Sequence, residues 1–437
     1  MIHSEAELRD VNFKPPLLES IPLGIQHVLA MFVGNVTVPL IIAGAISLPQ
    51  AETIFLVQAT MFVAGIATLV QALGIGPIGA RLPIVMGTSF GFVPIMLPIA
   101  ETYGLPAILG ATFVGGFAMA IVGLCMRWIQ FLFPTVVTGT FVIMIGIILM
   151  PVGFTYVGGG FGVEDFGSTT HLGLAGFVFL VILGVHQFTK GLLSELAVLV
   201  GIVAGYLVAI PLGLVDFSSI SEASVLQLPV PLHIGMEFVP VAIGGMVLMA
   251  IVTSAESIGD IAGTAISGAH RQPTERELSG GVLADGLASS FAAIFNAFPQ
   301  ISFSQNVGLV ALTGVASRYV VAIGGIFLVI AGLLPKLGAF ITTIPNAVLG
   351  GAVVIMFGLI TAAGMKMLAT VRFDKRNMLI IGISLSLAIG LRGQDALYAN
   401  VSPGLHAMLQ SGLIPGAMMS IILNLVLPKN AENDEEK

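Results

Sequence analysis

Repeated apolar runs of about 18–22 residues constrain the fold of this chain more than any other feature. A bilayer core of roughly 30 Å is crossed by about 20 residues of helix. Charged residues make up 9% of the chain and hydrophobic residues 56%, whereas soluble domains carry roughly 25% charged residues. The sequence therefore predicts an all-α polytopic membrane protein.

The apolar runs divide into fourteen candidate membrane segments joined by short connections. We place the segments approximately at residues 20–46, 53–75, 83–99, 105–126, 131–153, 171–187, 192–214, 236–258, 281–297, 299–314, 317–334, 344–364, 376–392 and 408–427.

Lys and Arg residues are distributed unevenly among the connections. Of the 16 in the chain, 14 lie before segment 1, in or beside the even-numbered connections, or after segment 14. Only Lys336 and Arg392 lie on the other side. Because cytoplasmic loops carry the excess of positive charge, we predict that both termini are cytoplasmic. Residues 1–17 do not resemble a cleavable signal peptide, and we expect the acidic tail 429–437 to be solvated and disordered.

The two halves of the chain resemble each other at an offset of about 210 residues. Pro83 precedes Ser89 by six residues, as Pro299 precedes Gln305. Further matches are the glycine sets Gly115, Gly116, Gly123 and Gly324, Gly325, Gly332, and the motifs FPTVVTG at 133–139 and IPNAVLG at 344–350. Seven segments per half is an odd number, so the halves must insert with opposite orientation, as in inverted-repeat transporters.

Segments 3 and 10 are irregular. Each opens with proline and alternates like a strand, with Ile84 then Met86 and Ile301 then Phe303, before a short apolar run. We predict a short strand followed by a half-helix in both, a backbone that a membrane tolerates only where it is buried in protein or faces a cavity. The N-termini of the half-helices would meet near mid-membrane and favour electron-rich ligand atoms.

The stretch from Phe298 to Gly314 puts two side-chain amides, Gln305 and Asn306, near the predicted bilayer centre. Two amides in lipid would cost several kcal/mol unless they have partners. They therefore line a substrate site in a transporter or form an amide clamp between helices. Ser89 and Phe90 occupy the equivalent place in segment 3, where Phe90 could stack on a planar ring or belong to ordinary core packing.

Four ionisable residues lie within predicted segments, where such groups are expensive and usually functional. Glu256 and Asp260 are four residues apart on one helical face of segment 8. Two close carboxylates in a low dielectric do not easily both ionise, so the pair could carry a proton; alternatively, Asp260 simply caps the end of segment 8. Asp285 could bridge to the half-helix of segment 10, take the proton, or belong to a packing network. His27 could exchange protons near neutral pH or be a neutral histidine satisfied by its neighbours.

Sequence motifs of other functional classes are missing. The chain has no P-loop, no dinucleotide-binding glycine fingerprint, no HExxH and no GxSxG. Its 7 histidines form no spacing typical of metal ligands or of a nucleophile and its base. The sequence therefore predicts neither an enzyme nor a cofactor or metal site.

With these residues laid out, the chain resembles the nucleobase–ascorbate transporter family from about Leu18 to Leu427. The most specific match is the family signature, here Gln305, Asn306, any residue, Gly308, four residues and Thr313. Supporting matches are QHVLAMF at 26–32, GTSF at 87–90, AESIGD at 255–260 and LADG at 283–286.

The resemblance implies fourteen segments in two inverted repeats, arranged as a core domain that moves against a gate domain. The core domain would comprise residues 18–127 and 235–336 (segments 1–4 and 8–11), and the gate domain residues 128–214 and 337–428 (segments 5–7 and 12–14). It also implies a homodimer in a bacterial inner membrane, with no nucleic-acid partner.

The resemblance assigns roles to the site residues as well. Glu256 and Gln305 would hydrogen-bond the base, Phe90 would stack near it, and backbone groups at Ser89 and Ser304 would help. The supporting polar network and the proton-coupling residues would be Asn306, Asp260, Asp285 and His27.

These inferences predict a proton-coupled symporter that imports xanthine, uric acid or both by alternating access. Gln305 supports that substrate choice, because uracil-type members tend to carry glutamate at this place. Uracil transport is the first alternative. An anion carrier of the same architecture is the second, although such relatives are expected to lack carboxylates at the half-helix ends and often carry a soluble C-terminal domain.

Overall fold

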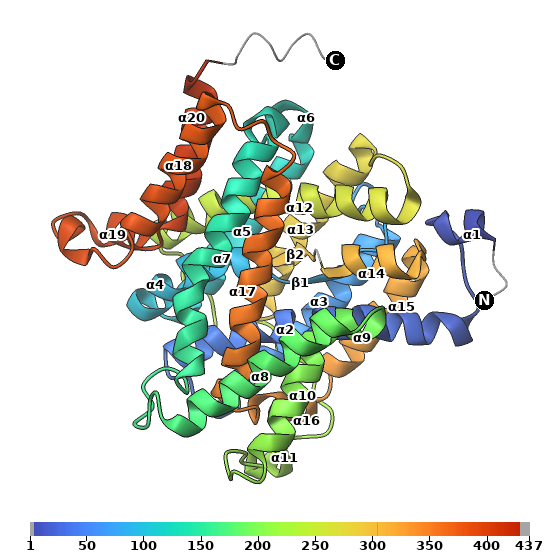
Figure 1. The fold of residues 1–437 in the computed structure, drawn as a ribbon, viewed down its shortest axis with the longest axis vertical. Helices are drawn as coiled ribbons and strands as arrows, with labels where there is room; N and C mark the ends of the chain where they lie inside the picture. The colour runs from blue at the N-terminus through green and yellow to red at the C-terminus, as the bar shows by residue number, and fades with distance from the viewer. Residues whose placement is uncertain (1–3, 304, 429–437) are drawn as a thin grey trace.

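In the computed structural model, which describes residues 4–303 and 305–428, almost every apolar run forms a helix (Figure 1). The predicted disordered tail at 429–437 lies outside the described residues. The helices are α1 (Glu5–Arg9), α2 (Leu17–Ala45), α3 (Gln50–Leu73), α4 (Val93–Tyr103), α5 (Leu105–Leu124), α6 (Met126–Ile129), α7 (Thr135–Val157), α8 (Thr169–Phe188), α9 (Leu192–Glu195), α10 (Ala197–Ala209), α11 (Ser218–Glu222), α12 (Pro240–Ala269), α13 (Glu275–Ile294), α14 (Gln305–Thr313), α15 (Arg318–Gly332), α16 (Pro335–Thr342), α17 (Asn346–Leu368), α18 (Lys375–Gly390), α19 (Pro403–Gln410) and α20 (Leu413–Val426). The strands are β1 (Met86–Thr88) and β2 (Gln300–Ser302).

Seven helices among the described residues are long and apolar enough to cross a membrane, namely α2, α3, α5, α7, α8, α12 and α17. An eighth crossing results if α15 and α16, which are bent by 83° relative to each other, form one span. The other predicted segments correspond to shorter or broken elements such as α10, α14 and α20. The polytopic helical architecture is thus confirmed, whereas the count of fourteen segments stays a prediction.

The long helices pack as two groups. In one group α5 packs on α12 and α13, and α15 packs on α2 and α3. In the other, α7 packs on α17, α17 on α8, α8 on α10, and α18 on α20. The small two-stranded sheet lies within the first group, because β1 contacts α2 and α3 while β2 contacts α13 (Figure 1).

The repeated glycines make equivalent close contacts in the two halves. A Cβ atom at Gly123 of α5 would lie 2.5 Å from the backbone nitrogen of Leu283 in α13. A Cβ atom at the matching Gly332 of α15 would lie 2.3 Å from the backbone nitrogen of Phe62 in α3. Small residues let helix backbones approach this closely in lipid. The sequence repeat therefore corresponds to a repeat in packing, as an inverted-repeat architecture requires.

The two related proline motifs also occupy equivalent places. Pro134 and Pro345 are the N-cap residues of α7 and α17, which are each 23 residues long and pack against one another. Proline suits the start of a helix because it lacks the N–H that would have no partner there.

The close approach of α5 and α13 makes a testable prediction. We expect Gly123→Ala to destabilise the protein by about 1–3 kcal/mol, because the added methyl group meets backbone atoms that cannot move aside. Gly173→Ala in α8 is the matched control, since nothing lies within 4 Å of a Cβ atom there. Thermal unfolding in detergent should show a lower Tm for the first variant only. Equal Tm values would mean that α5 and α13 are not in close contact.

Candidate functional site

The two irregular segments meet as an antiparallel strand pair. Met86 pairs with Ser302, and Thr88 pairs with Gln300. The pairing extends by one residue, because the Ser89 amide donates to the carbonyl of Pro299 at 3.0 Å. Each strand then leads into a half-helix, β1 through a 3-10 turn into α4, and β2 into α14. The prediction of a short strand and a half-helix in segments 3 and 10 is therefore confirmed.

A buried aspartate fastens the second strand to three helices. Asp285 of α13 is fully buried, and its carboxylate accepts hydrogen bonds from four donors. These donors are the Gln71 amide of α3 (3.0 Å), the Ser257 hydroxyl of α12 (2.5 Å), and the hydroxyl (3.0 Å) and backbone amide (3.2 Å) of Ser302 in β2. Four donors match the lone-pair sites of a carboxylate. The structure thus places Asp285 as a bridge to the broken segment 10, one of the alternatives left open by the sequence.

Neutral polar side chains that sequence reasoning missed hold the first strand. Asn35 of α2 accepts hydrogen bonds from the backbone amide of Thr88 (2.9 Å) and from its hydroxyl group (3.2 Å). The hydroxyl of Thr68 in α3 accepts from the Met86 amide at 2.9 Å. The available signal was a polar residue inside an apolar run, since such a residue needs a partner in lipid.

His27 of α2 lies against Asn306 of α14. Its Nδ1 atom is 2.7 Å from the Asn306 side-chain nitrogen, which makes the histidine the acceptor of this hydrogen bond. Both side chains are buried, and the Asn306 side-chain oxygen has no hydrogen-bond partner among the described residues. The pair ties the first turn of α14 to α2. Asn306 thereby provides an interhelical contact next to the position of Gln305.

Glu256 and Asp260 lie on the face of α12 that packs against α14. Gly263 is seven residues after Glu256 and shares its helical face, and a Cβ atom at Gly263 would lie 3.2 Å from Val307 of α14. Within the described part of the chain, one carboxylate oxygen of each acid is buried without a hydrogen-bond partner. These two acids therefore have free acceptors beside the half-helix, unlike Asp285.

The structure excludes the simpler reading of Asp260 as a helix cap. We predicted that segment 8 ends at residue 258, but α12 continues to Ala269. Residues 259–269 contain no proline that would remove a backbone hydrogen bond, and the helix continues through Asp260. The predicted segment boundary was wrong, and Asp260 lies well inside the helix.

Gln305 is the first residue of α14 and is partly exposed. Its side-chain amide makes no hydrogen bond to another described residue, so it is available to a ligand. Ser304, the other predicted contact next to it, lies outside the described residues. On the opposite segment, Ser89 is the N-cap of the 3-10 turn, and its hydroxyl accepts from the Gly91 amide at 3.2 Å.

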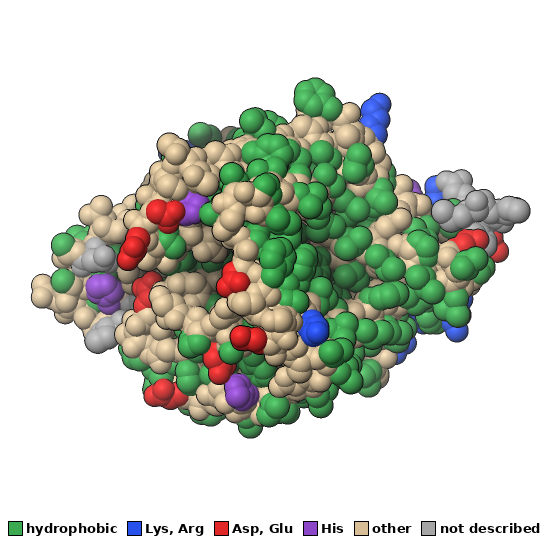
Figure 2. Space-filling view, turned by 90° about the horizontal axis from the view of Figure 1, so that it is seen from below, with side chains coloured by type: hydrophobic (Ala, Val, Ile, Leu, Met, Phe, Trp, Pro, Cys, Tyr) green, Lys and Arg blue, Asp and Glu red, His purple; other side chains and the backbone are tan. Residues whose placement is uncertain are grey.

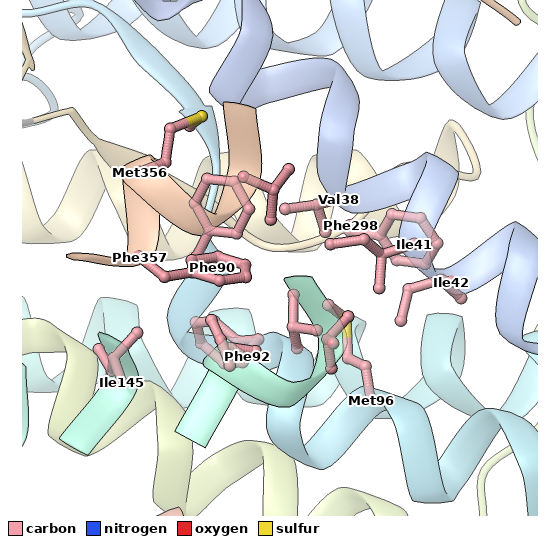
Figure 3. Close-up of a cluster of buried hydrophobic side chains, with 14 of the residues drawn as sticks. Val38, Ile41, Ile42, Phe90, Phe92, Met96, Ile145, Phe298, Met356 and Phe357 are labelled. Carbon is pink, nitrogen blue, oxygen red and sulfur yellow. The ribbon is translucent and has the colours of Figure 1, made fainter. Parts of the chain in front are cut away.

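Phe90 lies where the two groups of helices meet. Its ring and that of Phe357 in α17 form an edge-to-face pair, with ring centres 5.5 Å apart and an angle of 88° between the planes. Figure 3 shows these two rings together with Met356 and Val38. Phe90 is thus part of an apolar cluster in this structure.

Together these residues suit a polar, planar ligand held in mid-membrane. Gln305 offers a donor and an acceptor on one amide, and Glu256 offers a carboxylate on the neighbouring helix. The start of α14 adds unsatisfied backbone N–H groups and a partial positive charge. Within the described residues, no group of three or more His, Cys, Asp or Glu is arranged to hold a metal ion.

Comparisons with known proteins identify similar sequences over nearly the whole chain. Residues 18–396 match a family model described as a permease family. The uric acid permease PucK of Bacillus subtilis is 39% identical over 422 residues, covering 96% of this chain and 98% of the relative. The xanthine permease of the same organism is 38% identical over 416 residues, covering 93% of each.

A solved structure shares the fold at much lower sequence identity. The transmembrane domain of the cyanobacterium bicarbonate transporter BicA aligns with a TM-score of 0.56 and 13% identity, covering 94% of this chain and 98% of that one. This likeness establishes a common transporter fold and does not bear on the substrate.

Proposed function

Because this chain belongs to the nucleobase–ascorbate transporter family, which consists of permeases and not enzymes, we propose that it imports xanthine, uric acid or both in symport with protons. The observation that carries this proposal is the position of the signature residue Gln305. It begins a half-helix beside the acidic face of α12, and its amide makes no hydrogen bond to another residue that the structure describes.

The proposed binding mode uses complementary hydrogen bonds. An oxidised purine presents alternating carbonyl and N–H groups along its edges, and the Gln305 amide can both accept from and donate to such an edge. Glu256 in its protonated form would donate to a purine acceptor. Backbone groups at Ser89 and Ser304 would complete the site, and Phe90 would stack near the ring.

Coupling to protons is proposed for the two acids with free oxygens. Glu256 and Asp260 each keep one carboxylate oxygen without a partner among the described residues. Two neighbouring carboxylates in a low dielectric hold a proton between them more readily than two negative charges. Asp285 is the weaker candidate, since its oxygens already accept four hydrogen bonds.

Alternating access would arise from movement between the two helix groups, which correspond to the proposed core domain (18–127, 235–336) and gate domain (128–214, 337–428). Among the described residues, one polar contact that joins them comes from the Tyr156 hydroxyl of α7, which donates to the Leu40 carbonyl of α2 at 2.8 Å. The Phe90–Phe357 contact also crosses this boundary. Both contacts can break without leaving a charged group unpaired.

The distribution of Lys and Arg supports cytoplasmic termini in a bacterial inner membrane. The homodimer is carried over from the family resemblance. Chemical cross-linking of the purified protein in lipid nanodiscs would test it, and a single-chain product alone would contradict it.

Uptake of labelled xanthine into cells that produce the protein tests the function. We expect excess unlabelled uric acid or xanthine to reduce uptake, uracil to have little effect, and a protonophore to abolish accumulation. Strong competition by uracil would favour the uracil alternative. Accumulation that persists with the protonophore would exclude proton coupling, and no uptake of any nucleobase would overturn the proposal.

A further inference from the structure

One of the two basic residues on the predicted outer side lies in a cavity. Arg392 follows the end of α18 and is partly buried. Within the described residues its guanidinium makes no hydrogen bond or ion pair, although an unpaired cation that is partly removed from water is costly. Lys336, the other outer cation, does not line this cavity. The position of Arg392 therefore calls for a functional explanation.

The cavity has a volume of about 320 Å³ and lies between the two helix groups. Its walls come from α4, from the predicted outer end of α7, and from the segments around Arg392 and Gln410. Ligand pockets for small molecules begin at roughly 300 Å³, so the space suits a bicyclic ring. The walls combine apolar residues such as Leu97 and Phe161 with a few polar groups, and Arg392 is the one cation among the residues that line the cavity.

Glu101, the acid in this cavity, leaves the Arg392 guanidinium available to a ligand. Glu101 of α4 also lines the space, but no ion pair joins it to Arg392 in the described structure. The hydroxyl of Ser411 is engaged within its own segment, donating to the Met408 carbonyl at 2.6 Å. Arg392 lines the cavity, and a guanidinium carries a planar fork of N–H donors that suits paired acceptors on a flat anion.

The acidic residues of the predicted outer surface explain why a single cation there would affect the approach of an anionic substrate. Figure 2 views the molecule from the end that carries α11, where acidic side chains are common and basic ones few. Acidic residues of the predicted outer connections include Glu52, Glu164, Asp216 and Glu222. Such a surface repels anions, and uric acid is largely an anion at neutral pH. A cation beside such a surface offsets this repulsion for an anionic substrate.

We propose that Arg392 forms an outer entry subsite that captures the anionic form of an oxidised purine before it reaches Gln305. This inference rests on the proposed function. The carbonyl and deprotonated ring nitrogen on one edge of the purine would accept from the guanidinium, while the apolar walls contact the ring faces. No bond is made or broken, and the substrate moves inward as the two helix groups shift.

Initial uptake rates at mildly acidic pH test this proposal, because xanthine is then neutral whereas uric acid is still largely anionic. We expect Arg392→Gln to raise the KM for uric acid about tenfold with little change in maximal rate, since a charge-assisted bidentate contact is lost. The KM for xanthine should change by less than about twofold. Arg392→Lys should bring the KM for uric acid part of the way back to that of the unaltered protein. Lys336→Gln should leave the KM for both purines unchanged.

The outcomes separate this proposal from the proposed function. If the unaltered protein takes up neither purine, the proposed function fails. If it takes up both, and Arg392→Gln impairs both equally at matched amounts in the membrane, the entry subsite is overturned. Arg392 would then serve the fold or close the outer mouth by pairing with Glu101, and in the latter case Glu101→Gln would slow both purines alike.

Discussion

Replacing Asp285 with alanine is expected to abolish transport and to destabilise the protein more than any other single change at the site. The substitution removes a buried acceptor that receives four hydrogen bonds, from Gln71, Ser257 and Ser302. The Gln71 amide keeps acceptors in the Ser302 hydroxyl and the Gly281 carbonyl, so the donors of Ser257 and Ser302 are the ones left without a partner. Each orphaned buried donor costs about 1–3 kcal/mol. The strand β2 would lose its link to α12 through Asp285, while the hydrogen bonds between Ser289 of α13 and Gln300 would remain. The half-helix that begins at Gln305 would then be held less firmly.

Thermal unfolding and xanthine uptake together test this prediction. Asp285→Asn should be intermediate, because the amide oxygen can still accept hydrogen bonds while its NH₂ group faces donors. Asp260→Asn is the matched control for stability, since one oxygen of Asp260 has no partner among the described residues. An Asp285→Ala protein with an unchanged Tm would show that this network does not support the strand pair.

Replacing Glu256 with glutamine is expected to remove accumulation of substrate against a gradient while leaving binding largely intact. Glutamine keeps a hydrogen-bond donor for the purine, but its side chain neither binds nor releases a proton near neutral pH. Glu256 packs in the α12 face beside α14 and has a free oxygen, so the neutral substitution leaves the fold undisturbed. Substrate exchange across the membrane without a gradient should therefore persist.

Proteoliposomes with an imposed pH gradient provide the measurement. The unaltered protein should concentrate xanthine inside, whereas the Glu256→Gln protein should only equilibrate it. Uphill uptake by the variant at the normal level would remove Glu256 from proton coupling and direct attention to Asp260. Loss of both exchange and binding would instead indicate that purine binding requires the carboxyl group of Glu256 and that the glutamine amide does not replace it.

Much of the fold followed from patterns within short stretches of sequence. The apolar runs predicted the long helices, and proline followed by strand-like alternation predicted β1 and β2. The boundaries of α12 were less predictable. Polar residues such as Asp260 and Thr264 lower the local hydropathy without ending the helix, and α12 runs through both of them to Ala269.

The site was predictable only in part. The sequence singled out Glu256, Asp260, Asp285 and His27 because ionisable groups in apolar runs are rare. It did not single out Gln71, a neutral residue of α3, although this side chain contacts Asp285, 214 positions further along the chain. A neutral polar residue in an apolar run is common enough that its partner must be seen before its role is clear.

The amino-acid sequence alone determined that the chain resides in a membrane, where its two backbone breaks lie, and which charged groups occur at their depth. These properties follow from hydropathy and backbone preference, which act over one or two turns of chain. The folded structure alone decided that the Asn306 side chain donates a hydrogen bond to His27 and that Arg392 lies in a cavity. It also decided that both carboxylate oxygens of Asp285 accept hydrogen bonds, whereas one oxygen of Glu256 has no partner among the described residues. Those outcomes depend on hydrogen bonds and packing between residues far apart in the chain, which no local pattern encodes.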